Sequence, residues 1–105
     1  MHVALFGTDA VLVETVRGWL ADDGHLVRQT DSTQALTDWH EQRPLQAIIC
    51  CGRLPASLAT ACAAIEASSS KPLRLIAIDA DAASPWRALA EPLRRRVLKA
   101  TLNSA

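Results

Sequence analysis

Leu45–Cys51, with the sequence Leu-Gln-Ala-Ile-Ile-Cys-Cys, is the stretch that decides the fold. A nearly continuous apolar run of this kind is typical of a strand at the centre of a parallel sheet, where helices cover both faces. Shorter apolar runs at Val3–Phe6 and Leu73–Ile78 predict two more buried strands. His25–Gln29 predicts a further strand with a weaker pattern.

A helix is predicted in each interval between these strands. Thr8 or Asp9 can cap the first helix, and the Asp-Asp-Gly sequence at 22–24 ends it. Asp31 or Ser32 can cap the second helix, and the third is rich in alanine. The apolar residues that recur at helical spacing and are expected to face the core are Leu12, Val16, Trp19, Leu20, Ala35, Leu36, Trp39, Leu58, Ala61, Cys62 and Ile65.

The alternation of strands and helices determines the fold class. Successive strands separated by helices form parallel pairs with crossover connections. We therefore predict an α/β fold with a doubly wound parallel sheet, whose functional site lies at the carboxyl ends of the strands. A chain of 105 residues is long enough for one hydrophobic core, so residues 1–105 are expected to form a single domain.

The last third of the chain has a less definite pattern. Trp86–Leu89 fits either a short edge strand or one helical turn, and the sequence leaves both open. Pro92 can occupy the first position of a final helix. The residues expected on the inner side of that helix are Leu93, Val97, Leu98 and Leu102.

Charge and cysteine content exclude several classes of protein. Lys and Arg together number eleven, and Asp and Glu together also number eleven. The chain therefore has no net positive charge that would attract nucleic acid or an anionic membrane. The three cysteines are an odd number and two are adjacent, which suits a reducing compartment. The first residues do not resemble a signal peptide, and no apolar run approaches the roughly 20 residues of a membrane span. We expect the domain to be cytoplasmic, either in a soluble protein or as the cytoplasmic part of a membrane-bound one.

Common cofactor and catalytic motifs are missing from the sequence. The turn Gly7-Thr8-Asp9-Ala10 has one glycine, and the sequence contains neither G-x-G-x-x-G nor a P-loop. It also lacks C-x-x-C and G-x-S-x-G, and its three histidines are scattered. We therefore predict no cofactor, no metal site and no enzymatic activity in this domain.

Four segments nevertheless resemble the receiver domains of response regulators, the CheY-like family with a flavodoxin-like sheet of about five strands. The segment 7–25 is similar to the end of the first strand of that family, the helix that follows it and the glycine before the second strand. The segment 48–55 is similar to its third strand and phosphoacceptor loop. The segment 75–80 resembles the fourth strand. Glu91-Pro92-Leu93 resembles the Lys-Pro segment before the last helix.

The resemblance also implies which positions carried the phosphorylation chemistry, and each has changed. The two acidic positions that would hold Mg²⁺ are Gly7 and Thr8, with Asp9 one step late. The acceptor position is Cys51 and the hydroxyl position is Asp79. The lysine position is Glu91. Phosphoryl transfer needs a carboxylate nucleophile, a coordinated cation and a positive group, so the resemblance implies a degenerate receiver that is not phosphorylated.

Asp79 and Glu91 are only twelve positions apart, which leaves too little chain for a full helix. The fourth helix of the family is therefore expected to be shortened or missing. Degenerate receivers of this kind occur in hybrid sensor histidine kinases. We accordingly interpret the chain as a protein-interaction domain in a two-component phosphorelay, as part of such a kinase, with a kinase core or a true receiver as partner. Homodimerisation is left open, and neither nucleic acid nor a membrane is expected as a partner.

Some residues have two interpretations. Cys51 is either an inert buried residue, which we favour, or the reactive thiol of a small-ligand or redox sensor. Trp86 is either an exposed interface anchor or a lid over the sheet where the fourth helix is missing. Leu89, Arg94 and Arg95 complete the candidate interface, although consecutive arginines point around much of a helix and suit a solvated face or salt bridges.

Overall fold

The computed structural model describes residues 2–7, 9–52, 55–68, 73–78, 86–89 and 94–103, and every structural statement below concerns this part of the chain. Its strands are β1 (His2–Gly7), β2 (Leu26–Thr30), β3 (Ala47–Cys51), β4 (Arg74–Ile78) and β5 (Arg87–Leu89). Its helices are α1 (Ala10–Asp22), α2 (Thr33–Gln42), α3 (Ala56–Ser68) and α4 (Arg95–Asn103).

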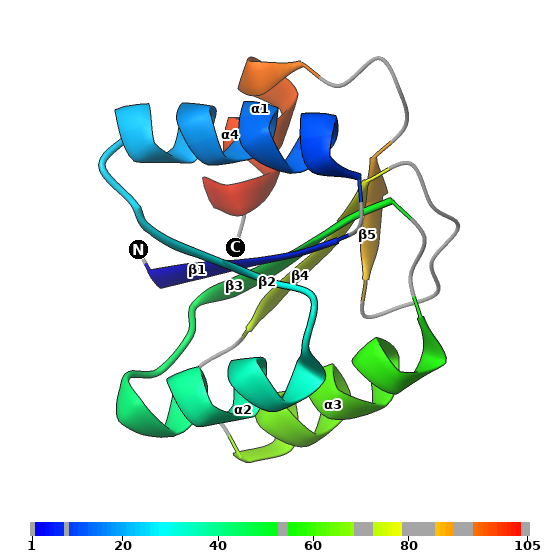
Figure 1. The fold of residues 1–105 in the computed structure, drawn as a ribbon. Helices are drawn as coiled ribbons and strands as arrows, with labels where there is room; N and C mark the ends of the chain where they lie inside the picture. Colours follow the sequence, from blue (N-terminus) through cyan, green and yellow to red (C-terminus); the bar gives the residue numbers. More distant parts are fainter. Residues whose placement is uncertain are drawn as a thin grey trace.

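The five strands form one sheet in the order β2-β1-β3-β4-β5, and every neighbouring pair is parallel. Helices α1 and α4 cover one face of the sheet, and α2 and α3 cover the other (Figure 1). This is the flavodoxin-like strand order, in which the chain first moves outward to one edge and then crosses back over β1. The predicted doubly wound fold is therefore confirmed.

Two hydrophobic layers hold the helices to the sheet. Alternate residues of each strand point to opposite faces, so neighbours in sequence belong to different layers. Ile49 and Cys51 of β3 pack with α1 and α4, whereas Ile48 and Cys50 pack with α2 and α3. All five residues of β3 are buried, because β3 lies between β1 and β4 and has a helical layer on each face. This double burial explains why its sequence is apolar without alternation.

The helix caps show which local predictions were right. Asp9 caps α1, because its carboxylate accepts a hydrogen bond of 3.2 Å from the backbone amide of Leu12. Ser32 occupies the N-cap position of α2, but its side chain makes no capping hydrogen bond. Its backbone amide donates instead to Thr30 Oγ1 at 2.9 Å.

The end of the chain settles one alternative and corrects another prediction. Arg87–Leu89 is a strand that pairs in parallel with β4, so Trp86–Leu89 does not form a helical turn. Leu98 and Leu102 of α4 are buried as expected, whereas Val97 is 40 % exposed. Val97 lies about 100° around the helix from Leu98, which turns it away from the sheet. Pro92, Leu93 and the segment 79–85, where the fourth helix was predicted to be shortened or missing, lie outside the described residues.

The helices within the described ranges are too short or too polar to cross a membrane.

Candidate functional site

The predicted site lies at the carboxyl ends of the central strands. Gly7 ends β1 and Cys51 ends β3, and these two residues are direct partners in the parallel register. Ile78 at the end of β4 is the next partner of Cys51. The structure thus brings Gly7 and Cys51 together, while the other predicted members Thr8, Asp79 and Glu91 lie outside the described residues.

Gly7 leaves no space for a side chain. A Cβ atom at this position would lie 2.9 Å from the Cys51 Cβ and closer still to the Cys51 carbonyl oxygen. Real Cβ atoms do not approach other heavy atoms so closely. A carboxylate at the first of the two acidic positions of a receiver therefore cannot be accommodated here unless the ends of β1 and β3 move apart.

Cys51 is completely buried in the layer formed with α1 and α4. Burial, with smaller contributions from the nearby Cys50 thiol and Asp9 carboxylate, raises the pKa of its thiol to about 12. At neutral pH roughly one molecule in 10⁵ carries the thiolate, which is the reactive form. The acceptor position thus holds a small apolar group with little nucleophilic character.

Asp9 is an acidic residue that the structure places near Cys51 and Gly52. It is exposed, and its carboxylate accepts the capping hydrogen bond at the start of α1. On the other side of Cys51, Gly52 has a φ of +96°, a backbone conformation that favours glycine, and its amide donates to the Ile78 carbonyl at 3.0 Å. Within the described ranges, no group of three or more His, Cys, Asp or Glu residues could hold a metal ion.

Trp86 could serve as an interface anchor only if its side chain were exposed, and it is not. Its side chain is 8 % exposed and belongs to the hydrophobic layer that α3 covers. This position corresponds to the other interpretation, a lid over the sheet. Leu89 is half-buried and packs against the opposite layer, so it too contributes to the core.

The two arginines of the predicted interface differ in their surroundings. Arg95 donates to Asp23 at 2.9 Å and lies 3.9 Å from an oxygen of Asp22, which joins α4 to the end of α1. The hydrogen bond from Arg95 lowers the pKa of Asp23. Arg94 is exposed and forms none of these contacts. No local sequence signal reveals the Arg95–Asp23 pair, because the partners are 72 positions apart.

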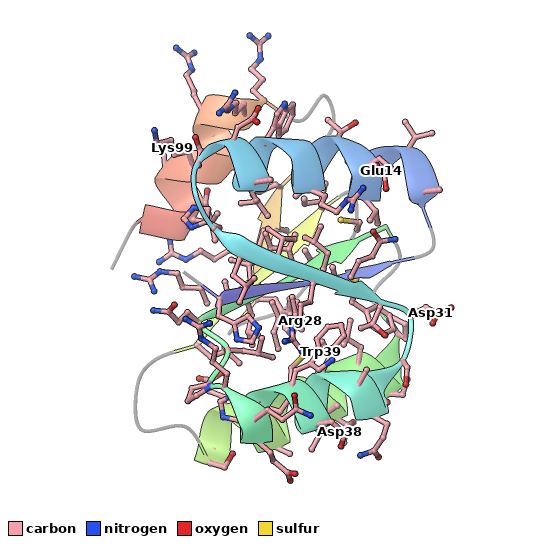
Figure 2. The ribbon with its side chains drawn as sticks, turned by 60° about the vertical axis from the view of Figure 1, so that its left-hand side comes forward. Glu14, Arg28, Asp31, Asp38, Trp39 and Lys99 are labelled. Atoms are coloured by element: carbon pink, nitrogen blue, oxygen red, sulfur yellow. The ribbon has the colours of Figure 1, made fainter. Side chains whose placement is uncertain are left out.

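A second pair that the sequence did not reveal lies at the β2 edge of the sheet. The guanidinium of Arg28 on β2 lies 5.6 Å from the ring centre of Trp39 on α2, a cation–π arrangement visible in Figure 2. Trp39 also packs partly against the core layer of α2 and α3. This pair helps to fix α2 beneath the edge strand.

The strand order, the helical layers and the position of the site define a receiver-type fold. Solved structures of this class superpose on nearly the whole chain. One is a response regulator receiver domain protein from Bacillus halodurans, with a TM-score of 0.71 over 98 % of this chain and 94 % of that one. A second is the pseudo-receiver domain of the CikA protein, with a TM-score of 0.71 over 96 % and 92 %.

A third similar structure is the Saccharomyces cerevisiae complex of the histidine phosphotransfer protein Ypd1 with the receiver domain of the response regulator Ssk1. Its TM-score is 0.68, and the match covers 95 % of this chain and 85 % of that one. Sequence identity is 16 % in all three cases, so the likeness concerns the fold. The sequence itself matches neither a protein-family model nor a curated protein.

Proposed function

We propose that this chain is a receiver-like domain that binds other proteins of a two-component system and is not phosphorylated. The observation that carries the proposal is the contact between the ends of β1 and β3. Gly7 has no space for an acidic side chain, and its partner Cys51 supplies a buried neutral thiol where a receiver has its phosphoacceptor carboxylate. A phosphoryl group would find neither a nucleophile nor a ligand set for Mg²⁺ at these positions.

The proposed context is a hybrid sensor histidine kinase, in which the domain docks against the kinase core or a true receiver. Two of the similar structures support a place in two-component signalling. One is described as a pseudo-receiver domain, and another contains a receiver domain together with a histidine phosphotransfer protein. We propose that the domain fixes the relative geometry of such partners and catalyses no reaction itself.

The redox-sensor alternative depends on a reactive Cys51. Such a thiol needs a lowered pKa and access to solvent. Cys51 has the opposite properties, because it is fully buried and its pKa is raised to about 12. The docking function is therefore the better supported of the two.

The test is a titration of the ¹⁵N-labelled chain with Mg²⁺, followed by addition of beryllofluoride, which mimics an acyl phosphate. We expect the amide resonances of Gly7, Asp9, Cys51 and Gly52 to remain where they are. The amides of β2, at the edge of the sheet, serve as the internal reference for bulk salt effects. An active receiver treated in the same way provides the positive control.

Incubation with acetyl phosphate and Mg²⁺ supplies the second readout. The expected intact mass is that of the unmodified chain. Saturable shifts confined to the strand ends, or a gain in mass of one phosphoryl group, would refute the proposal that the domain is not phosphorylated.

A further inference from the structure

The exposed side of α4 carries a concentration of positive charge. Arg94, Arg96 and Lys99 are all exposed, and Val97 lies among them with 40 % of its surface accessible. Residues three apart are neighbours on a helix, so Arg94 adjoins Val97 and Arg96 adjoins Lys99. Arg94 and Arg96 point about 160° apart, so these four residues, which we call the basic face, spread over most of the solvent-exposed side of α4. Figure 2 shows Lys99 extending outward from α4.

Within the described part of the molecule, no ion pair neutralises this charge, although Lys99 is near enough to Asp23 to help lower the pKa of that carboxyl. Arg95, which interrupts the basic face in sequence, has its own partners in Asp22 and Asp23. Arg94, Arg96 and Lys99 form no ion pair with a described residue. Helix α4 itself contains no acidic residue. The whole chain is neutral, so the basic face is a local excess of charge.

The placement of the arginines is unfavourable for the helix that carries them. Arg94 precedes α4, and its carbonyl accepts hydrogen bonds of 3.1 Å from the amides of Val97 and Leu98. The amino end of a helix has a partial positive charge, which repels cations and favours Asp, Ser or Thr at the cap. Arg94–Arg96 therefore weaken α4, and no ion pair with a described residue offsets this for Arg94 and Arg96.

We propose that the basic face is a docking surface for an acidic segment of a partner protein. Carboxylates of the partner would neutralise the arginines, and an apolar side chain would cover Val97. Opposite charges at the rim of an interface accelerate association and select the partner. This inference rests on the proposed docking function and adds the surface and the chemistry of the partner.

Three features favour a protein over a polyanion such as nucleic acid or an anionic membrane. The chain has no net positive charge, which binding to nucleic acid generally requires. Trp39, Trp19 and Trp86 are all at least half-buried, so none is available to stack on bases. Val97 is the single large hydrophobic residue exposed on α4, which is too little to anchor a helix in lipid.

The test uses a short helical peptide with a leucine stripe flanked by glutamates, titrated into the ¹⁵N-labelled chain. A second peptide has glutamine in place of every glutamate. We expect the acidic peptide to shift the amides of residues 94–100, and the glutamine peptide to leave them unchanged. Binding should weaken as salt rises from about 50 to about 300 mM, because exposed charges are then screened.

Two matched variants separate a local effect from a general effect of charge. Arg94→Gln/Arg96→Gln removes two charges from the basic face, and Arg17→Gln/Arg43→Gln removes two exposed charges elsewhere. The first variant should bind the peptide roughly fivefold more weakly, and the second should bind as the wild type does. Circular dichroism confirms that both variants fold.

Four results would overturn the inference, and three of them concern binding: no shifts on α4, equal weakening in both variants, or tighter binding to a single-stranded oligonucleotide or phosphatidylserine vesicles than to the peptide. Self-association of the chain, abolished by Arg94→Gln/Arg96→Gln, would replace the partner protein with a second copy and also overturn it. Each of these results is independent of the beryllofluoride titration, so failure here is distinguishable from failure of the proposed function.

Discussion

Gly7 and Cys51 are parallel-strand partners whose backbones are so close that a Cβ on Gly7 would lie 2.9 Å from the Cys51 Cβ. This relationship connects the packing of the sheet with the function of the domain. The central strands approach each other closely at the carboxyl end of the sheet, where the candidate site lies. The proposed loss of phosphorylation therefore rests on the backbone packing at Gly7 as well as on the side-chain chemistry at Cys51.

Gly7→Ala should destabilise the domain. The added methyl group meets the backbone of Cys51, which cannot rotate away as a flexible side chain could. Overpacking of this kind costs about 1–3 kcal/mol, measured as the loss in free energy of unfolding in urea. Gly18→Ala is the matched control, because a Cβ at Gly18 in α1 meets nothing within 4 Å. That control should gain about 0.5–1 kcal/mol from its better helix propensity. Equal effects of the two substitutions would contradict the close approach of β1 and β3.

The three cysteines should resist alkylation in the native state. All three are buried and none forms a disulfide, and burial raises the thiol pKa to about 11 for Cys50 and to about 12 for Cys51 and Cys62. Iodoacetamide at neutral pH should modify the folded chain only at the rate of unfolding, and should modify all three thiols in guanidinium chloride. Intact mass against time provides the measurement. Rapid modification of Cys51 alone in the folded chain would favour the redox sensor.

Trp86→Ala should reduce stability strongly. Trp86 is 8 % exposed and packs in the layer that α3 covers, so its removal leaves a cavity beneath the edge of the sheet. Substitutions of this kind cost about 3–5 kcal/mol. Trp39→Ala, at a half-buried position, should cost less. Urea denaturation of both variants distinguishes the two interpretations of Trp86, because an exposed interface anchor could be replaced without loss of stability.

The sequence was sufficient to predict the fold because the central strands β1, β3 and β4 are buried on both faces. Runs such as Leu45–Cys51 are apolar because they are buried, and this can be recognised in the sequence alone. The alternation of such runs with helices then implies that the strands pair in parallel. Strand limits were less certain: β3 begins at Ala47, two residues later than predicted. Asp9, one of the two residues predicted as possible caps, does cap α1, and such a prediction is feasible because capping is a local interaction.

The sequence pattern could not predict features that depend on tertiary structure. Val97 is apolar and adjacent to Leu98, but the angle between them on the helix determines that only Leu98 faces the sheet. The ion pair of Arg95 with Asp23 joins two distant segments. At the candidate site, the sequence showed which residue types had changed. It did not show that the backbone at Gly7 excludes a side chain, because that depends on the distance between neighbouring strands.

The stability of the domain should fall on mild acidification because of His2. His2 is buried at the start of β1, and its Nδ1 lies 3.2 Å from the Arg43 carbonyl oxygen, which can only accept. Nδ1 therefore donates, and Nε2 is buried without a partner. Burial lowers the pKa of His2 below 6.5, and the nearby charges of Arg28 and Arg43 lower it further. Below pH 6.5 the unfolded chain binds the proton more readily than the folded chain, so stability is complete above that pH and is lost as pH falls towards the folded pKa.

The free energy of unfolding, measured in urea between about pH 7.5 and about pH 5, should decline, and His2→Gln should make that decline shallower. Burial also lowers the pKa of His25, so His25→Gln serves as the comparison that retains the contribution of His2. The Asp23 carboxylate does not interfere, because its lowered pKa places its titration below pH 3.8. A decline in His2→Gln as steep as that of the wild type would show that the buried imidazole is not the group responsible. A resonance of His2 that titrates at or above pH 6.5 would contradict the direction of the shift itself.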